Sequence, residues 1–285
     1  MNRAPDRYAV LGNPVAHSQS PFIHAEFARQ TGQHMEYTRV LCPMDGFAEA
    51  VRAFAASGAR GCNVTVPFKF AAPALASTVT PRAALAQAAN VLRFDGEAWL
   101  ADNTDGIGLV RDLQLHAGVS LCGLRVLLAG AGGAAAGVLG PLLEAAPCAL
   151  HVANRSPERA QALVQRHAAL AARCGVALSC SGLDGAGAAY DVVLNSSASS
   201  LGGAAVPVHD RVLKPGALAV DLMYGAAARP FLDWARGLGA TPRDGLGMLV
   251  EQAAEAFFLW RGVRPDTAPV LDRLRRHLDL ATPHS

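Results

Sequence analysis

The sequence contains few charged residues, and their distribution is not that of a nucleic-acid-binding protein. Only 17% of the residues are charged while 51% are hydrophobic, which excludes a generally disordered chain. The formal net charge is +2, and the basic residues are scattered rather than gathered in a stripe or a tail. We therefore expect small-molecule partners and no nucleic acid.

Metal-ligand spacings are missing as well. The six cysteines include no CxxC pair, and the nine histidines include no HxxxH or HxH set. These absences argue against structural zinc, so we expect no metal and six reduced, buried thiols. The first residues, MNRAPDRYAVLGNP, lack the apolar core and cleavage site of a secretory signal, which predicts a cytoplasmic protein.

One uncharged stretch, residues 126–143, is about as long as a membrane span. It contains five glycines and a proline, which interrupt a helix of that length. We therefore expect a strand, a turn and a helix in this stretch, and no membrane partner.

The length and the order of the predicted elements indicate two α/β domains. A chain of 285 residues is long for one core, and a crevice between two cores commonly binds a small ligand. Residues 8–12 and 63–66 are expected to form strands, and residues 21–31 a helix. From Leu124 onward, apolar runs alternate with helical segments, which is typical of a parallel, doubly wound sheet. These runs are at 125–129, 149–153, 190–194 and 217–222. After Asp244 the chain is expected to be helical.

A glycine-rich turn after the first apolar run marks a candidate dinucleotide site. The segment is Gly130-Ala131-Gly132-Gly133-Ala134, and a helix is expected to follow it. Glycines allow a tight turn and let the backbone approach a pyrophosphate at the positively polarised start of the helix. A glycine cluster alone is also compatible with a plain structural turn.

The end of the second apolar run favours NADP over NAD. A carboxylate at this position binds the 2′-hydroxyl of NAD, whereas arginine binds a 2′-phosphate. Here the run is followed by Asn154 and Arg155, and Arg159 comes four residues later. Between the arginines, Ser156 and Pro157 predict a helix start with serine as the cap. Two guanidinium groups can hold one phosphate, although both arginines could equally be solvated.

Lysine is rare in this sequence, and its rarity draws attention to Lys69. Among the 25 lysines and arginines, the only lysines are Lys69 and Lys214. An ammonium group can lose its proton when its surroundings lower its pKa, whereas a guanidinium practically cannot. Lys214 lies in an ordinary Lys-Pro-Gly turn, but Lys69 follows the predicted strand end at 63–66.

Asp105 is the candidate partner of that lysine. Reduction of a ketone needs a proton for the oxygen, and the reverse reaction needs that proton removed, so a lysine paired with a carboxylate suits both directions. Asp105 lies in Asp102-Asn-Thr-Asp-Gly, just before the predicted nucleotide-binding half. The same segment is equally compatible with an Asx-type turn between domains. Similarly, Ser18 and Ser20 could bind a substrate carboxylate or could simply cap the helix that follows.

Together these segments resemble the shikimate dehydrogenase family over essentially the whole chain. The matching motifs are Gly12-Asn-Pro-Val-Ala-His-Ser18-Gln-Ser20-Pro, Asn63-Val-Thr65-Val-Pro-Phe-Lys69, Ala89-Asn90, Asp102-Asn-Thr-Asp105-Gly, Gly130-Ala-Gly-Gly-Ala, Asn154-Arg155 and Asp244-Gly-Leu-Gly-Met-Leu-Val-Glu-Gln252. The resemblance implies reversible, NADP-dependent reduction of 3-dehydroshikimate to shikimate, in aromatic amino acid biosynthesis. It also implies a monomer or homodimer.

The resemblance further implies a fold and a set of site residues. Residues 1–104 and 245–285 would form an α/β substrate domain completed by C-terminal helices, and residues 105–244 a Rossmann-type NADP-binding domain. Lys69 and Asp105 would be catalytic. The substrate would be bound by Ser18, Ser20, Asn63, Thr65, Asn90, Tyr224 and Gln252. The cofactor would be bound by Gly130, Ala131, Gly132, Gly133, Ala134, Asn154, Arg155, Arg159 and Gly247.

Some positions depart from the family pattern. The glycine motif has Ala135 and Ala136 where a serine and an arginine are common, and residues 195–200 replace the usual Asn-Ala-Thr. These departures bear on the affinity for NADP more than on the reaction. Two alternatives stay open: a paralogue that also accepts quinate or NAD, and a nucleotide-binding regulator without catalysis. The retained Lys69 and Asp105 argue against the regulator.

Overall fold

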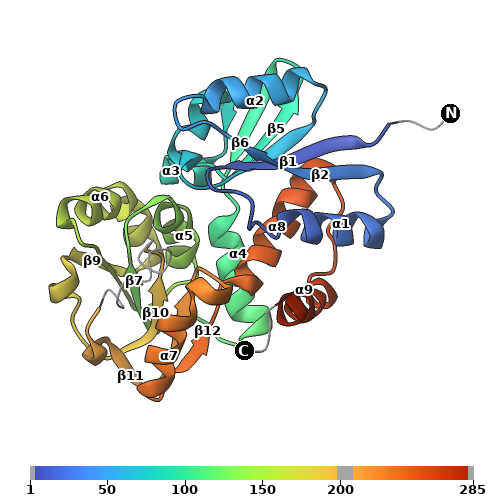
Figure 1. Cartoon of the computed structure of the whole chain (residues 1–285). Coiled ribbons are helices and arrows are strands. Elements are labelled where there is room, and N and C mark those ends of the chain that lie inside the picture. The colour runs from blue at the N-terminus through green and yellow to red at the C-terminus, as the bar shows by residue number, and fades with distance from the viewer. Residues whose placement is uncertain (1–3, 198–207, 282–285) are drawn as a thin grey trace. The chain divides into compact units, whose positions relative to one another are not determined.

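The computed structural model describes residues 4–197 and 208–281, and the chain divides into two compact units (Figure 1). The first unit is Met1–Leu109 with Leu249–Ser285, and the second is Val110–Met248. Helices α4 (Asp105–Arg111) and α8 (Leu246–Arg261) each contain one of the boundaries. Both units are built on six-stranded sheets flanked by helices, which confirms the predicted α/β class.

The first unit contains a mixed sheet. Its strands, in order across the sheet, are β2 (Met35–Leu41), β1 (Asp6–Gly12), β3 (Gly61–Val64), β5 (Val91–Asp95), β6 (Ala98–Asp102) and β4 (Thr78–Val79). Strand β1 is parallel to β2 and β3, while β5 is antiparallel to β3 and β6. The predicted strand at 8–12 and the predicted strand end at 63–66 are both present.

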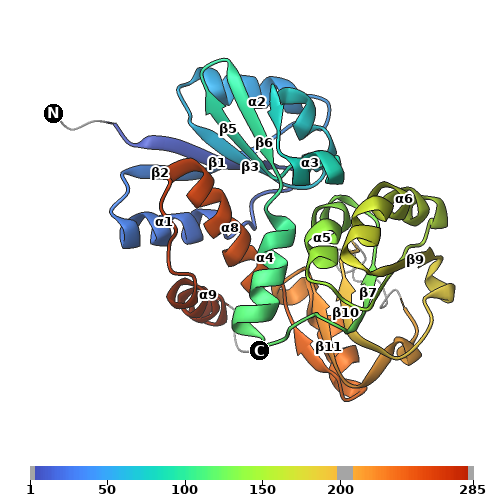
Figure 2. The ribbon, with the colours of Figure 1, turned by 180° about the vertical axis from the view of Figure 1, so that it is seen from behind.

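Helices cover both faces of this sheet because side chains alternate along its central strand. Ala9 and Leu11 of β1 belong to a core that includes residues of α2 (Phe47–Ala56). Tyr8 and Val10 belong to the opposite core, to which α8 contributes Trp260. Helix α1 (Ser20–Thr31) and helix α9 (Ala268–Ala281) contact each other on that second face (Figure 2). The short helix α3 (Pro81–Ala86) precedes β5.

The second unit contains a parallel, doubly wound sheet, as the sequence predicted. Its strands, in order, are β12 (Thr241–Arg243), β11 (Leu213–Asp221), β10 (Tyr190–Asn195), β7 (Arg125–Ala129), β8 (Ala149–Ala153) and β9 (Ala177–Ser181). All neighbouring strands are parallel. This is the strand order of dinucleotide-binding folds, which bind ligands where the order reverses, here between β7 and β10.

Three long helices connect strands of the parallel sheet. They are α5 (Gly133–Glu144), α6 (Pro157–Cys174) and α7 (Arg229–Gly237). Because crossovers between parallel strands are right-handed, α5 and α6 lie on one face and α7 on the other. Phe231 and Ala235 of α7 share a core with Leu127 of β7. The uncharged stretch at 126–143 is thus divided between a strand and a helix.

Several sequence expectations need correction. Cys42 and Cys62 are buried, but Cys122 and Cys148 are exposed because both lie in turns just before strands, so six buried thiols was wrong. Lys214 does not lie in a simple turn: it belongs to β11, and its ammonium group pairs with Asp191 at 2.7 Å.

The described residues also bear on membranes and metal ions. Within residues 4–197 and 208–281, no helix combines the length and the apolar character needed to cross a membrane. The same ranges contain no cluster of three or more histidine, cysteine or acidic side chains suited to a metal ion.

Candidate active site

Lys69 and Asp105, which the sequence suggested as an acid–base pair, form a salt bridge. Lys69 belongs to the short helix η1 (Phe68–Phe70) after β3, and Asp105 is the first residue of α4. The Lys69 Nζ atom lies 2.7 Å from Asp105 Oδ2, and the side chains are 15% and 5% exposed. Low exposure strengthens the attraction between the two charges and keeps the pair in one geometry.

The second oxygen of the Asp105 carboxylate is held by Asn90. The Asn90 amide nitrogen donates to Asp105 Oδ1 at 2.9 Å. The backbone N–H of Asp105 donates to Asn103 Oδ1 at 3.1 Å, which is the Asx-type contact that the sequence also suggested. The turn and the acid–base pair are therefore compatible, because the turn orients the carboxylate.

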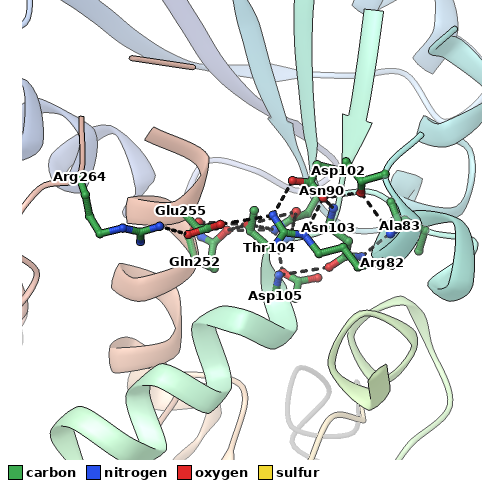
Figure 3. A network of polar contacts seen from close by, with 12 residues as sticks. Arg82, Ala83, Asn90, Asp102, Asn103, Thr104, Asp105, Gln252, Glu255 and Arg264 are labelled. Atoms are coloured by element: carbon green, nitrogen blue, oxygen red, sulfur yellow. Dashed lines mark hydrogen bonds and ion pairs between the residues drawn. The ribbon is translucent and has the colours of Figure 1, made fainter. Parts of the chain in front are cut away.

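Asn90 is the centre of a buried network that joins three segments (Figure 3). Its side-chain oxygen accepts from the backbone N–H of Thr104 at 2.8 Å, and its nitrogen donates to Gln252 Oε1 at 3.0 Å. Thr104 Oγ1 in turn donates to the carbonyl oxygen of Gln252 at 3.0 Å. A Cβ at Gly108 would lie 2.6 Å from the Gln252 Cβ, so glycine there lets α4 approach α8. The network holds the candidate ligands Asn90 and Gln252 beside Asp105.

A second layer of this network, which the sequence reasoning missed, is built on Asp102. Its carboxylate is 1% exposed and accepts from Thr80 Oγ1 at 2.6 Å, Arg82 Nε at 2.7 Å and the backbone N–H of Asn103 at 2.7 Å. Arg82 also lies 3.4 Å from Glu255 of α8. Burial opposes the charge of Arg82, but Asp102 and Glu255 leave its pKa raised. The position of Asp102 at the start of the Asp-Asn-Thr-Asp segment was the available signal.

Ser18 and Ser20 are buried and contact each other at the start of α1. Ser18 Oγ lies 3.2 Å from Ser20 Oγ and accepts from the backbone N–H of Ser20 at 3.3 Å. The cap position of α1 is Gln19, which makes no side-chain cap bond. Arg39 donates to the carbonyl oxygen of Ser18 through Nε at 2.9 Å and Nη2 at 2.5 Å. Ser18 thus bonds the first N–H of α1, as the helix-cap interpretation expects, while neither serine occupies the N-cap position itself.

Asn63 and Thr65 lie at the end of β3, next to the end of β1. Tyr37 Oη donates to Asn63 Oδ1 at 2.7 Å, and Asn63 Nδ2 donates to the carbonyl oxygen of Asn90 at 3.1 Å. A Cβ at Gly12 would lie 2.4 Å from Thr65 Cγ2, which explains the glycine at the end of β1. Six of the seven candidate substrate ligands thus belong to the first unit.

Tyr224, the seventh, belongs to the second unit, in the loop after β11. Asp221 at the end of β11 organises this loop, because its Oδ1 accepts from the backbone N–H of Met223 at 2.8 Å. Its Oδ2 accepts from Asn195 Nδ2 at 3.0 Å, and both side chains are buried. Asn195 begins the segment 195–200 that departs from the family pattern, but residues 198–200 lie outside the described ranges.

Gly247 lies at the start of α8, within the second unit. A Cβ there would lie 1.7 Å from Asp112 Oδ1, so this site accepts only glycine while Asp112 keeps its position. Asp112 is fully buried and pairs with Arg243 of β12 through both carboxylate oxygens, with Arg243 Nε to Oδ2 at 2.9 Å. Sequence reasoning missed Asp112 and Arg243, which carry no motif of their own.

The glycine-rich turn has the features of a phosphate cradle. Gly130 follows β7 with φ of +114°, and a Cβ there would lie 2.5 Å from Ser196 Oγ. Gly132 is the N-cap of α5, makes no side-chain cap bond, and has open space where a Cβ would be. The first N–H groups of a helix point toward its start, where they attract an anion. Ala131, Gly133 and Ala134 are partly exposed beside it.

The end of β8 presents two exposed arginines. Asn154 Nδ2 donates to the carbonyl oxygen of Ser156 at 2.9 Å, which shapes the turn before α6. Helix α6 starts at Pro157 with Ser156 at the N-cap position, as predicted, although the Ser156 side chain makes no cap hydrogen bond. Arg155 and Arg159 are exposed, and within the described ranges their guanidinium groups make no hydrogen bond or ion pair.

Comparison with known families gives matches along most of the chain. Residues 10–92 match the pattern described as the shikimate dehydrogenase substrate binding domain, residues 113–205 the shikimate / quinate 5-dehydrogenase pattern, and residues 245–275 the shikimate 5′-dehydrogenase C-terminal domain. A relative from Methylibium petroleiphilum named shikimate dehydrogenase (NADP(+)) is 66% identical over 278 residues, covering 95% of each chain.

Solved structures are similar over the same length. An Ael1 enzyme from Pseudomonas putida is 45% identical with a TM-score of 0.85, covering 94% of this chain and 98% of its own. A shikimate 5-dehydrogenase from Thermus thermophilus, solved with NADP(H) and shikimate, is 32% identical with a TM-score of 0.81, covering 95% of this chain and 99% of its own.

Proposed function

The chain belongs to the shikimate dehydrogenase family, and we propose that it catalyses the reversible, NADP-dependent reduction of 3-dehydroshikimate to shikimate. The observation that carries this proposal is the buried salt bridge of Lys69 and Asp105, 2.7 Å from nitrogen to oxygen. A regulator without catalysis has no use for a pair that can pass a proton.

In this proposal Lys69 and Asp105 move the proton; bound NADP would supply the hydride acceptor for oxidation, and bound NADPH the hydride donor for reduction. For oxidation of shikimate, the pair removes the proton of the reacting hydroxyl group; for reduction, it returns a proton to the ketone oxygen. The hydrogen bond from Lys69 Nζ to Asp105 Oδ2 lets the proton pass between amine and carboxylate. Asn90 keeps the carboxylate turned toward Lys69.

We further propose that neutral polar side chains bind the substrate. Hydroxyl and amide groups can each donate or accept, which suits a ring that carries a carboxylate and several hydroxyl groups. The proposed ligands are Ser18, Ser20, Asn63, Thr65, Asn90, Tyr224 and Gln252. The burial of the two serines, Asn63, Asn90 and Gln252 supports this set, because buried polar groups with spare hydrogen-bonding capacity favour a ligand that uses it.

The residues of the second unit fit NADP. The open start of α5 suits the pyrophosphate, and the absence of a carboxylate at Asn154, together with two exposed arginines, suits the 2′-phosphate. We propose that Gly130, Ala131, Gly132, Gly133, Ala134, Asn154, Arg155, Arg159 and Gly247 bind the cofactor. Residues 105–244 would then be the NADP-binding domain, and residues 1–104 with 245–285 the substrate domain. The cytoplasmic location and the monomeric or homodimeric state stay predictions from the sequence.

The test is absorbance at the reduced-nicotinamide band when the purified protein is mixed with shikimate and NADP. We expect NADP reduction that depends on shikimate, with lower catalytic efficiency when quinate replaces shikimate or NAD replaces NADP. Comparable efficiency with quinate and NAD would instead support the paralogue with relaxed substrate choice. No reduction with any combination would contradict the proposed activity.

A further inference from the structure

Tyr37 is a buried phenol that touches two of the proposed substrate ligands. It lies on β2, and its hydroxyl group donates to Asn63 Oδ1 at 2.7 Å. Burial raises the pKa of Tyr37 well above its usual value, an effect to which Cys62 adds and which a hydrogen bond with Ser20 opposes. The phenol therefore keeps its proton, and its contact with Asn63 is always a donation.

The contacts of Asn63 fix which way its amide faces. Its oxygen is occupied by Tyr37, and one of its two N–H hydrogens is occupied by the carbonyl oxygen of Asn90 at 3.1 Å. Turning the amide over would place its oxygen against that carbonyl, where two acceptors repel. Asn63 therefore has one N–H donor left for a ligand, held in a fixed direction, besides the second lone pair of its oxygen.

The ring of Tyr37 is itself held in place. It stacks on His24 of α1, with ring centroids 4.2 Å apart and planes inclined by 9°. It also lies in the core that contains Tyr8, Val10 and Val15, against Trp260 of α8. A buried, stacked ring has little freedom, so its hydroxyl group presents a fixed donor to Asn63.

We propose that Tyr37 is a positioning residue for the substrate: its hydroxyl group fixes the orientation of Asn63, so that an N–H of Asn63 faces the substrate. The inference rests on the proposed function, since it assigns Asn63 and Ser20 to the substrate. The fixed orientation of the amide also limits which substrate atoms Asn63 can bind. The remaining N–H of Asn63 favours a substrate oxygen that accepts, such as a carboxylate, ketone or hydroxyl oxygen.

The experiment compares Tyr37→Phe with Tyr8→Phe, a matched control. Tyr8 and Tyr37 are register partners on β1 and β2 and share one apolar core, so each substitution removes one hydroxyl group from the same environment. The hydroxyl group of Tyr8 accepts instead from Arg261 at 3.3 Å. Measurements are the KM for shikimate, the KM for NADP, kcat and the melting temperature of each variant.

For Tyr37→Phe we expect the KM for shikimate to rise about tenfold, because the Asn63 oxygen loses its buried partner. The kcat should change by less than about threefold and the KM for NADP by less than about twofold, since the hydroxyl group contacts ligands of one substrate. Tyr8→Phe should leave both KM values unchanged. A purely structural role would lower the melting temperature of Tyr37→Phe and leave the shikimate KM within about twofold of wild type, which would overturn the inference.

A double variant separates action through Asn63 from other effects. In an Asn63→Ala background, Tyr37→Phe should cost much less than in the wild type, measured as kcat/KM from initial rates at low shikimate concentration. An equal loss in both backgrounds would mean that Tyr37 does not act through Asn63. A wild-type protein without shikimate-dependent activity would contradict the proposed function, whereas an active wild type with an unaltered Tyr37→Phe contradicts this inference alone.

Discussion

The two units present their candidate ligands in opposite ways. In the first unit the ligands are buried and bonded to one another: Asn90 alone contacts Thr104, Asp105 and Gln252. In the second unit the turn after β7 leaves helix N–H groups open, and Arg155 and Arg159 are exposed. In the first unit the candidate ligands hold one another in place, whereas the second unit offers backbone N–H groups and exposed arginine side chains.

The difference follows from what each proposed ligand demands. Proton transfer needs atoms held within hydrogen-bonding distance before the substrate arrives, so side chains are fixed by second contacts. A dinucleotide brings its own charges, and a phosphate can gather mobile guanidinium groups as it binds. Changes at the buried ligands of the first unit should therefore affect catalysis and folding together, whereas changes at the exposed Arg155 and Arg159 of the second unit should affect cofactor affinity alone.

The largest effect is expected for Lys69, which forms the buried salt bridge with Asp105. Lys69→Ala should lower kcat by about 10² to 10⁴, because the general acid–base step is lost, while the affinity for shikimate stays within several-fold. Lys69→Arg should keep the charge beside Asp105 but also lose turnover, since a guanidinium practically cannot release its proton. Steady-state kinetics with shikimate and NADP measure both. Loss of affinity with unchanged turnover would make Lys69 a binding residue instead.

The next largest effect is expected on folding, for Arg82. Arg82→Gln leaves the buried carboxylate of Asp102 without its cation, and breaking such a pair costs about 3 kcal/mol of unfolding free energy. Arg93→Gln is the matched control, because Arg93 pairs with Asp95 at 2.7 Å but both side chains are exposed. Its cost should stay below about 1 kcal/mol. Equal urea midpoints for the two variants would show that burial of the Asp102 pair does not matter.

A third effect concerns pH and again belongs to the first unit. His24 is fully buried, and burial lowers its pKa to about 3 from 6.5. The unfolded chain therefore binds a proton near neutral pH that the folded chain refuses, so stability is present above pH 6.5 and is lost as pH falls toward 3. From about pH 8 to about pH 5, His24 should cost about 2 kcal/mol. Urea titrations at each pH measure the free energy of unfolding. The decrease attributed to His24 should be absent in His24→Phe and should remain in His34→Phe, where an exposed histidine is replaced.

The smallest effect is expected in the second unit, for Arg155. Arg155→Ala should raise the KM for NADP about tenfold and reduce the preference for NADP over NAD, because one charge-assisted contact to the 2′-phosphate is lost. The melting temperature should not change, since the guanidinium group has no partner within the described ranges. Arg173→Ala, near the C-terminal end of helix α6, which begins two residues after Arg155, is the control. An unchanged NADP to NAD ratio would contradict the role of Arg155.

The sequence predicted the parallel sheet because its strands are uninterrupted apolar runs between small-residue helices. It brought Lys69 forward because lysine is rare and because Lys69 follows a predicted strand end, and Asp105 because it lies just before the predicted nucleotide-binding half. It did not reveal the mixed sheet in full, since β4, β5 and β6 are short and carry no clear alternation. Nor did it reveal Arg82 or Tyr37, whose importance depends on contacts across 20 or more residues, Arg82 with Asp102 and Tyr37 with Asn63. Contacts between residues so far apart in the chain produce no recognisable spacing in the sequence.

The departures from the family pattern in the glycine motif could be explained only from the burial of the residues in the structure. Ala135 and Ala136 are buried, at 0% and 2% exposure, in the first turn of α5. A serine or an arginine at these positions would have to displace packing to reach a phosphate. Their small side chains instead let the helix lie close to its sheet, so the backbone N–H groups of the turn carry the task of meeting an anion.

The first unit is made from both ends of the chain, which has a consequence for protein synthesis. Residues 110–248 leave the ribosome as a continuous segment and can fold before the chain is finished. The first unit cannot be completed until α8 has been synthesised, because Thr104 and Asn90 form hydrogen bonds with Gln252 of that helix. A chain that has not yet been translated as far as α8 therefore lacks one of its proposed substrate ligands, and the proposed site is completed late in protein synthesis.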